Sequence, residues 1–222
     1  MTTAAPFLSP GPDRAFDAVV FDFGGVLITP ITDLLDEVAG WHGISMTEML
    51  DVLLGPRETS TDDHPWHRAE RGELPTAALQ AEVAPFAAAA GLTLRGDEYE
   101  RLLCGVFVVR DAVVDLVRQL QAAGYTTGLL TNSFVEFRDH LESKVDFGLF
   151  DVVVDSSEVG CRKPEPAIYD IVTDRCAVAA DRILYFDDFA ANLVGATGAG
   201  WTTVHVTEEA AVAAGLAAHL GR

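Results

Sequence analysis

Residues that could carry chemistry stand at the ends of several short apolar segments. A lone carboxylate, Asp22, ends the run VVFD, and two adjacent acids, Asp187 and Asp188, follow the run ILYF. The segment LLT ends at Thr131 and is followed by Asn132, while Lys163 lies in the sequence GCRKP. Any one of these residues could simply cap a helix or a turn. Because the carboxyl ends of parallel strands meet at one edge of a sheet, all of them together favour a single site.

The residue types at these positions suit the transfer of a phosphoryl group. Asp22 could attack phosphorus, but both partners are negative, so a divalent cation such as Mg²⁺ must bridge Asp22 and the substrate, with Asp188 completing its shell. Thr131 and Asn132 could hold phosphoryl oxygens at the start of a helix. Lys163 would add a fixed positive charge where negative charge develops.

The elements that must position these residues read as alternating strands and helices. Strands are predicted for the run that ends at Asp22 and for 125–131, 151–155, 182–186 and 202–206. Helices are predicted for 111–123, 135–145, 165–177, 190–199 and 208–220. Strand, helix and strand at this spacing predict an α/β fold with a parallel sheet covered by helices on both faces.

Residues 29–110 break this alternation and predict a separate helical domain. The interval has no convincing strand but has amphipathic stretches at 31–41, 47–54, 75–90 and 97–103. We therefore expect an α-helical cap at 29–110, inserted after the first strand of a core formed by 16–28 and 111–222. Residues 1–15 are small and proline-bearing, which predicts a flexible tail.

The composition excludes several classes of partner. The 34 acidic residues outnumber the 15 basic ones and give a formal charge of −19, so the surface should repel nucleic acid and anionic membranes. No segment has the pattern of a signal peptide or a membrane span, and the three cysteines show no metal-binding spacing. These features predict a soluble, cytoplasmic protein. The sequence leaves its oligomeric state open.

Four motifs in this order resemble those of the haloacid dehalogenase superfamily. They are VVFDFGGVL (19–27), LLTNS (129–133), VGCRKPEPAIYD (159–170) and ILYFDDFAANLVGATGAGW (183–201). The resemblance implies a Rossmann-like core with strand order 3-2-1-4-5 and the small α-helical cap of the subfamily I phosphatases. The sequence around 160–170, together with WHRAERGEL at 66–74, is similar to sequences in the group that contains the phosphatase domain of soluble epoxide hydrolase.

The resemblance also implies a role for each matching residue. Asp22 would be the nucleophile that forms an aspartyl phosphate, Thr131 would bind the phosphate and Lys163 would stabilise it. Asn192 would tether the loop after the fourth strand. Mg²⁺ would be bound by Asp22, the backbone carbonyl of Gly24, Asp188 and, directly or through water, Asp187.

One residue departs from the family pattern, because Gly24 occupies the position of a second aspartate that acts as general acid and base. Either the leaving group departs unprotonated or another group supplies the proton, with Asp187, His64 and His67 as candidates. A 2-haloacid dehalogenase is an alternative, since halide departs as an anion and needs no such acid. Against it, the fourth motif of haloacid dehalogenases lacks the paired acids found at 187–188. A further alternative is a catalytically weak or inactive protein that binds phosphate or a partner.

Overall fold

A computed structural model describes residues 14–55, 64–105 and 107–221. These residues form one five-stranded parallel sheet, in which the strands lie in the order β3-β2-β1-β4-β5. The strands are β1 (Ala18–Phe21), β2 (Thr126–Thr131), β3 (Val152–Asp155), β4 (Ile183–Asp187) and β5 (Thr202–His205). The predicted fold class and strand order are confirmed.

The sheet is buried on both faces, as expected for parallel strands. Along β1, Val19 and Phe21 pack into one apolar cluster, whereas Ala18 and Val20 pack into another on the opposite face. This separation follows from the alternation of side chains along a strand.

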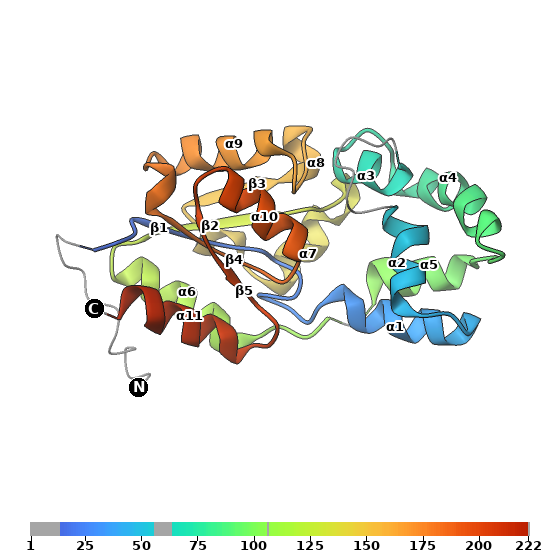
Figure 1. Ribbon diagram of the computed structural model, residues 1–222, viewed down its shortest axis with the longest axis horizontal. Helices are drawn as coiled ribbons and strands as arrows, with labels where there is room; N and C mark the ends of the chain where they lie inside the picture. Colours follow the sequence, from blue (N-terminus) through green and yellow to red (C-terminus); the bar gives the residue numbers. More distant parts are fainter. Residues whose placement is uncertain (1–13, 56–63, 106, 222) are drawn as a thin grey trace.

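Helices cover the two faces of this sheet (Figure 1). Helices α6 (Asp111–Ala122) and α11 (Ala210–Leu220) contribute side chains to the first cluster. Helices α9 (Pro166–Cys176) and α10 (Ala190–Gly198) contribute side chains to the second. Shorter elements connect them: η1 (Val135–Phe137), α7 (Arg138–Lys144), η2 (Phe147–Leu149), α8 (Ser156–Val159) and η3 (Ala180–Arg182). In the described ranges, every helix falls short of the length or apolar character that a membrane crossing requires.

The described helices between β1 and α6 lie beside the sheet, beyond its carboxyl edge (Figure 1). Its helices are α1 (Ile31–His42), α2 (Met46–Leu54), α3 (Pro65–Glu70), α4 (Thr76–Ala89) and α5 (Gly96–Cys104). They share an apolar cluster distinct from the two clusters of the sheet. We call this helical unit the cap and the sheet with its covering helices the core; their boundaries remain a prediction. The predicted tail lies almost wholly outside the described residues.

Sequence reasoning missed α3. The helix has only six residues, too few for a clear periodicity, although Pro65 at its first position is a recognised start signal. Its importance is positional, because it carries Trp66 and Glu70 to the boundary between the cap and the core.

Candidate active site

Asp22 follows β1 directly and begins a tight turn. The backbone N–H of Phe23 donates a hydrogen bond of 2.7 Å to Asp22 Oδ1. Gly25 in this turn has φ +69°, in the left-handed region that favours glycine, and a Cβ there would overlap Asp188 Oδ2. A Cβ on Gly24 would meet open space. The turn therefore requires glycine at position 25 but not at position 24.

Lys163 is the electrostatic centre of the site. Its buried ammonium group lies 2.8 Å from Asp22 Oδ1 and 2.9 Å from Asp187 Oδ2. It also donates to the carbonyl of Leu130 and the hydroxyl of Tyr185, both at 3.2 Å. Burial lowers the pKa of Lys163, but the carboxylates of Asp187 and Asp22 outweigh it and raise that pKa above its ordinary value. The ammonium group is therefore charged and fixed between the ends of β1 and β4.

Asp187 is fully buried, and protein donors occupy both of its carboxylate oxygens. Oδ1 accepts from the N–H of Phe189 at 2.7 Å, and Oδ2 accepts from Lys163 and from Tyr185. Asn192 Nδ2 lies 3.1 Å from both oxygens, which is the tether predicted for it. These bonds make Asp187 a support for Lys163 and leave Asp188 as the member of the pair that lines the cavity.

Thr131 and Asn132 extend from the end of β2 into the same cavity. The Asn132 side chain binds the backbone of Lys163 twice, accepting from its N–H at 2.8 Å and donating to its carbonyl at 3.0 Å. Asn132 thus fixes the segment that carries the ammonium group. Among the described residues, the hydroxyl of Thr131 has one hydrogen bond, a long one of 3.4 Å to the carbonyl of Asn132.

The acidic residues fit a divalent cation. In the described part of the chain, Asp22, Asp187 and Asp188 bring one carboxylate oxygen each to within 4.8 Å of the others. Burial raises the pKa of Asp22 well above its ordinary range, while Lys163 opposes that shift. Burial and the neighbouring Asp187 raise the pKa of Asp188 to about 7. Three carboxylates around the ammonium group of Lys163 are costly to ionise together, and carboxylate oxygens are the ligands that Mg²⁺ prefers.

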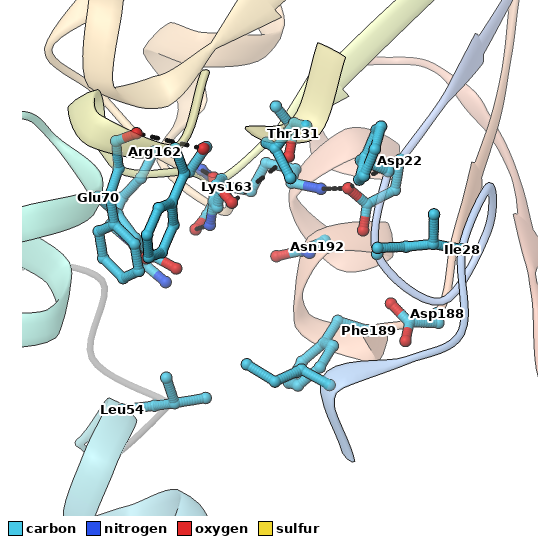
Figure 2. A pocket seen from close by; sticks show the side chains of 18 of the residues that line it. Asp22, Ile28, Leu54, Glu70, Thr131, Arg162, Lys163, Asp188, Phe189 and Asn192 are labelled. Carbon is cyan, nitrogen blue, oxygen red and sulfur yellow. Dashed lines mark hydrogen bonds and ion pairs between the residues drawn. The ribbon is translucent and has the colours of Figure 1, made fainter. Parts of the chain in front are cut away.

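The site opens into a cavity of about 200 Å³ between the core and the cap (Figure 2). Asp22 and Asp188 lie at one end of the view, and Glu70 and Arg162 lie at the other. Neither His64 nor His67, the two cap residues considered as candidate proton donors, is among the described residues that line this cavity. Both histidines are buried, and the His64 ring packs against Phe86 with centroids 4.5 Å apart.

Sequence reasoning missed Tyr185, Arg110 and Glu70. Tyr185 lies two residues before Asp187 on β4, so alternation along the strand could have placed both on one face. Arg110 donates to the carbonyl of Gly25, and Glu70 binds Arg162 across the boundary between cap and core. Neither contact has a local sequence signal, because each joins residues more than 80 positions apart.

Sequence comparison finds similar curated proteins, several of them named as phosphatases or hydrolases. Acyl-CoA dehydrogenase family member 10 of Mus musculus is 30% identical over 94% of the chain, but the chain spans only 19% of that protein. Sesquiterpene phosphatase astK of Aspergillus oryzae is 26% identical over 88% of the chain and 92% of its own length. Bifunctional epoxide hydrolase 2 of Mus musculus is 32% identical, although the match covers 39% of the chain and 17% of that protein.

Solved structures share the fold at lower identity. A HAD family enzyme from Bacteroides thetaiotaomicron, solved in complex with magnesium and inorganic phosphate, has a TM-score of 0.58 at 19% identity, over 87% of the chain and 96% of its own. The L-2-haloacid dehalogenase of Xanthobacter autotrophicus has a TM-score of 0.60 at 18% identity, over 89% of the chain and 81% of its own. The fold alone therefore does not decide between phosphate and halide chemistry. A family profile does match residues 16–200, a stretch that contains Asp22, Lys163 and Asp188, and the chain accordingly belongs to the haloacid dehalogenase-like hydrolases.

Proposed function

We propose that this hydrolase is a Mg²⁺-dependent phosphatase that acts on a small phosphorylated metabolite through an aspartyl phosphate on Asp22. The observation that carries the proposal is the ammonium group of Lys163, held between Asp22 and Asp187 while Asp188 faces the cavity. Mg²⁺ would be held by Asp22, Asp188 and the backbone carbonyl of Gly24, and would neutralise charge between the carboxylates and the phosphate. Asp187 would support the metal site through its ion pair with Lys163 and its hydrogen bond from the N–H of Phe189.

The residues divide the reaction into two steps. A carboxylate oxygen of Asp22 attacks phosphorus, the bond between phosphorus and the ester oxygen breaks, and that oxygen leaves with the electron pair. Lys163 and Thr131 would hold the phosphoryl oxygens during this transfer. Water then attacks the phosphorus of the aspartyl phosphate, which releases inorganic phosphate and restores the carboxylate.

Similarity to named phosphatases and the paired acids of the site both support phosphate as the group transferred. The sesquiterpene phosphatase matches over most of both chains, and Phosphoglycolate phosphatase of Escherichia coli is 31% identical over 43% of this chain. The paired acids Asp187 and Asp188 argue in the same direction, because adjacent carboxylates beside a nucleophilic aspartate suit a metal.

The test measures phosphate release from p-nitrophenyl phosphate and acetyl phosphate, with and without Mg²⁺. We expect turnover that requires Mg²⁺ and that is lost in Asp22→Asn. The matched control is Asp115→Asn, which makes the same change at a half-exposed carboxylate on α6. This variant should keep the activity.

Other outcomes identify the alternatives. Metal-independent halide release from 2-chloropropionate would support a dehalogenase. An absence of turnover across a broad panel of phosphates, with no change in thermal midpoint on adding Mg²⁺, would support a protein that binds phosphate or a partner without catalysis.

A further inference from the structure

The cavity has polar side chains at its two ends, the carboxylate cluster at one and Glu70 with Arg162 at the other, and apolar side chains line much of the wall between them. Core residues Phe134, Phe137 and Phe189 line it together with cap residues Ile31 and Leu54. Phe134 continues into the buried cluster of the cap, where its ring meets Trp66 edge to face with centroids 5.1 Å apart. The wall beyond the phosphate end is therefore an extension of the apolar core of the cap.

The polar side chains at the far end of the cavity are engaged with protein partners. Glu70 accepts from Trp66 Nε1 at 3.0 Å through one oxygen and pairs with Arg162 through the other (Figure 2). The side chains of Glu70 and Arg162 are each only 11% exposed. A hydroxyl-rich substrate would have to compete with these buried bonds, which is costly.

We infer that the cavity binds the apolar leaving group of a small phosphate monoester. This leaving group would be about as large as one aromatic ring or a chain of about six carbons. The inference rests on the proposed phosphatase function and specifies its substrate class. A volume of about 200 Å³ is below the range of about 300–1,000 Å³ typical of drug-sized ligands, so the apolar group is short. Sugar phosphates and other polyhydroxylated esters are disfavoured, because their hydroxyls would be buried against hydrocarbon.

The test compares two esters with the same kind of leaving oxygen and equally long chains, hexyl phosphate and 5-hydroxypentyl phosphate. We expect kcat/KM to be at least about tenfold higher for hexyl phosphate, because burying an unpaired hydroxyl is unfavourable. From ethyl to hexyl phosphate, kcat/KM should rise by up to about fourfold per methylene and then level off when the cavity is filled. Equal values for the two matched esters would overturn the inference.

Variants locate the preference in the cavity wall. Leu54→Asn introduces an amide among the lining residues and should reduce the ratio of the two kcat/KM values several-fold, whereas Leu54→Met keeps the wall apolar and should preserve it. Val194→Asn is the matched surface control, since Val194 is 73% exposed on α10. An unchanged ratio in a folded Leu54→Asn variant would contradict the assignment.

A binding measurement separates failure of this inference from failure of the phosphatase proposal. Hexylphosphonate and 5-hydroxypentylphosphonate cannot be hydrolysed, so calorimetric titration in the presence of Mg²⁺ reports recognition without chemistry. Tighter binding of hexylphosphonate supports the apolar site even if no ester is turned over. Phosphate release from acetyl phosphate with equal affinity for the two phosphonates would overturn the apolar site and leave the phosphatase standing.

Discussion

In the proposed phosphatase, the glycine at position 24 should decide which leaving groups depart easily. A family aspartate there would protonate the departing oxygen, and such help is worth about 10²- to 10⁴-fold in rate. A phenol has a pKa of about 10, close to that of the tyrosine side chain, and leaves more readily as an anion than an aliphatic alcohol does. The activity of the natural chain should therefore fall steeply as the pKa of the leaving group rises.

Gly24→Asp should restore the missing acid. A Cβ at this position meets nothing within 4 Å, and the backbone is not in the left-handed region, so a side chain can begin there without a clash at Cβ or backbone strain. We expect turnover of alkyl phosphates to rise about 100-fold, with little change for aryl phosphates. The measurement is kcat/KM plotted against leaving-group pKa, with Gly24→Asn as the isosteric control that has no acidic proton. A flat plot for the natural chain would mean that another group already supplies the proton.

The raised pKa of Asp188 predicts that Mg²⁺ binding depends on pH. Burial and Asp187 raise this pKa from the ordinary value of 3.8 to about 7, so a proton competes with Mg²⁺ below pH 7. The increase in thermal midpoint on adding Mg²⁺ should be small at pH 5.5 and large at pH 8. The apparent affinity should fall by up to about tenfold per pH unit below 7.

Without Mg²⁺, the raised pKa of Asp188 makes the folded protein less stable as the pH rises. An acid whose pKa is raised on folding stabilises the folded state fully below pH 3.8, and that contribution is lost as the pH rises through about 7. At pH 8 without Mg²⁺, Asp188→Asn should therefore unfold at a higher temperature than the natural chain. A lower midpoint for the variant under those conditions would show that Asp188 ionises without penalty.

The turn after β1 brings its backbone close to Asp188, one of the proposed Mg²⁺ ligands. Gly25 and Gly43 both have a positive φ, of +69° and +67°, but only at Gly25 would a Cβ meet Asp188. Alanine at either position should cost about 1 kcal/mol through backbone strain, and at Gly25 the overlap with Asp188 should add to that cost. Gly25→Ala should in addition abolish the thermal shift caused by Mg²⁺, whereas Gly43→Ala should retain it. Retained Mg²⁺ binding in Gly25→Ala would show that the close approach of the turn to Asp188 is dispensable.

The elements also explain what could be predicted from the sequence. The strands of the sheet were predictable because short β-branched runs alternate with helical periodicity, and parallel topology then brings Asp22, Lys163 and Asp188 to one edge. The role of Asp187 as a support for Lys163 was not predictable in detail, because it depends on hydrogen-bond geometry. The apolar wall depends on how the cap packs against Phe134, which no local pattern specifies.

At the scale of the whole molecule, ion pairs join the cap to the core beside the cavity. Glu70 of α3 pairs with Arg162, and Arg71 pairs at 3.1 Å with Glu165, so both core partners belong to the segment that contains Lys163. The site and the attachment of the cap are therefore built on the same stretch of chain. Loss of the ion pair between Glu70 and Arg162 should therefore lower the free energy of unfolding of the whole molecule.

Arg162→Met should destabilise the protein by about 3 kcal/mol, because it leaves the buried carboxylate of Glu70 without its cation. Glu70→Gln combined with Arg162→Met removes that unpaired charge and should recover most of the loss, measured as the free energy of unfolding in urea. Arg118→Met breaks a half-exposed pair with Asp115 and should cost less than about 1 kcal/mol. If Arg162→Met cost no more than Arg118→Met, the carboxylate of Glu70 would have to find water or another donor when the pair is broken. The contact between cap and core would then be held by the apolar cluster around Phe134, and the ion pair would serve only to align α3.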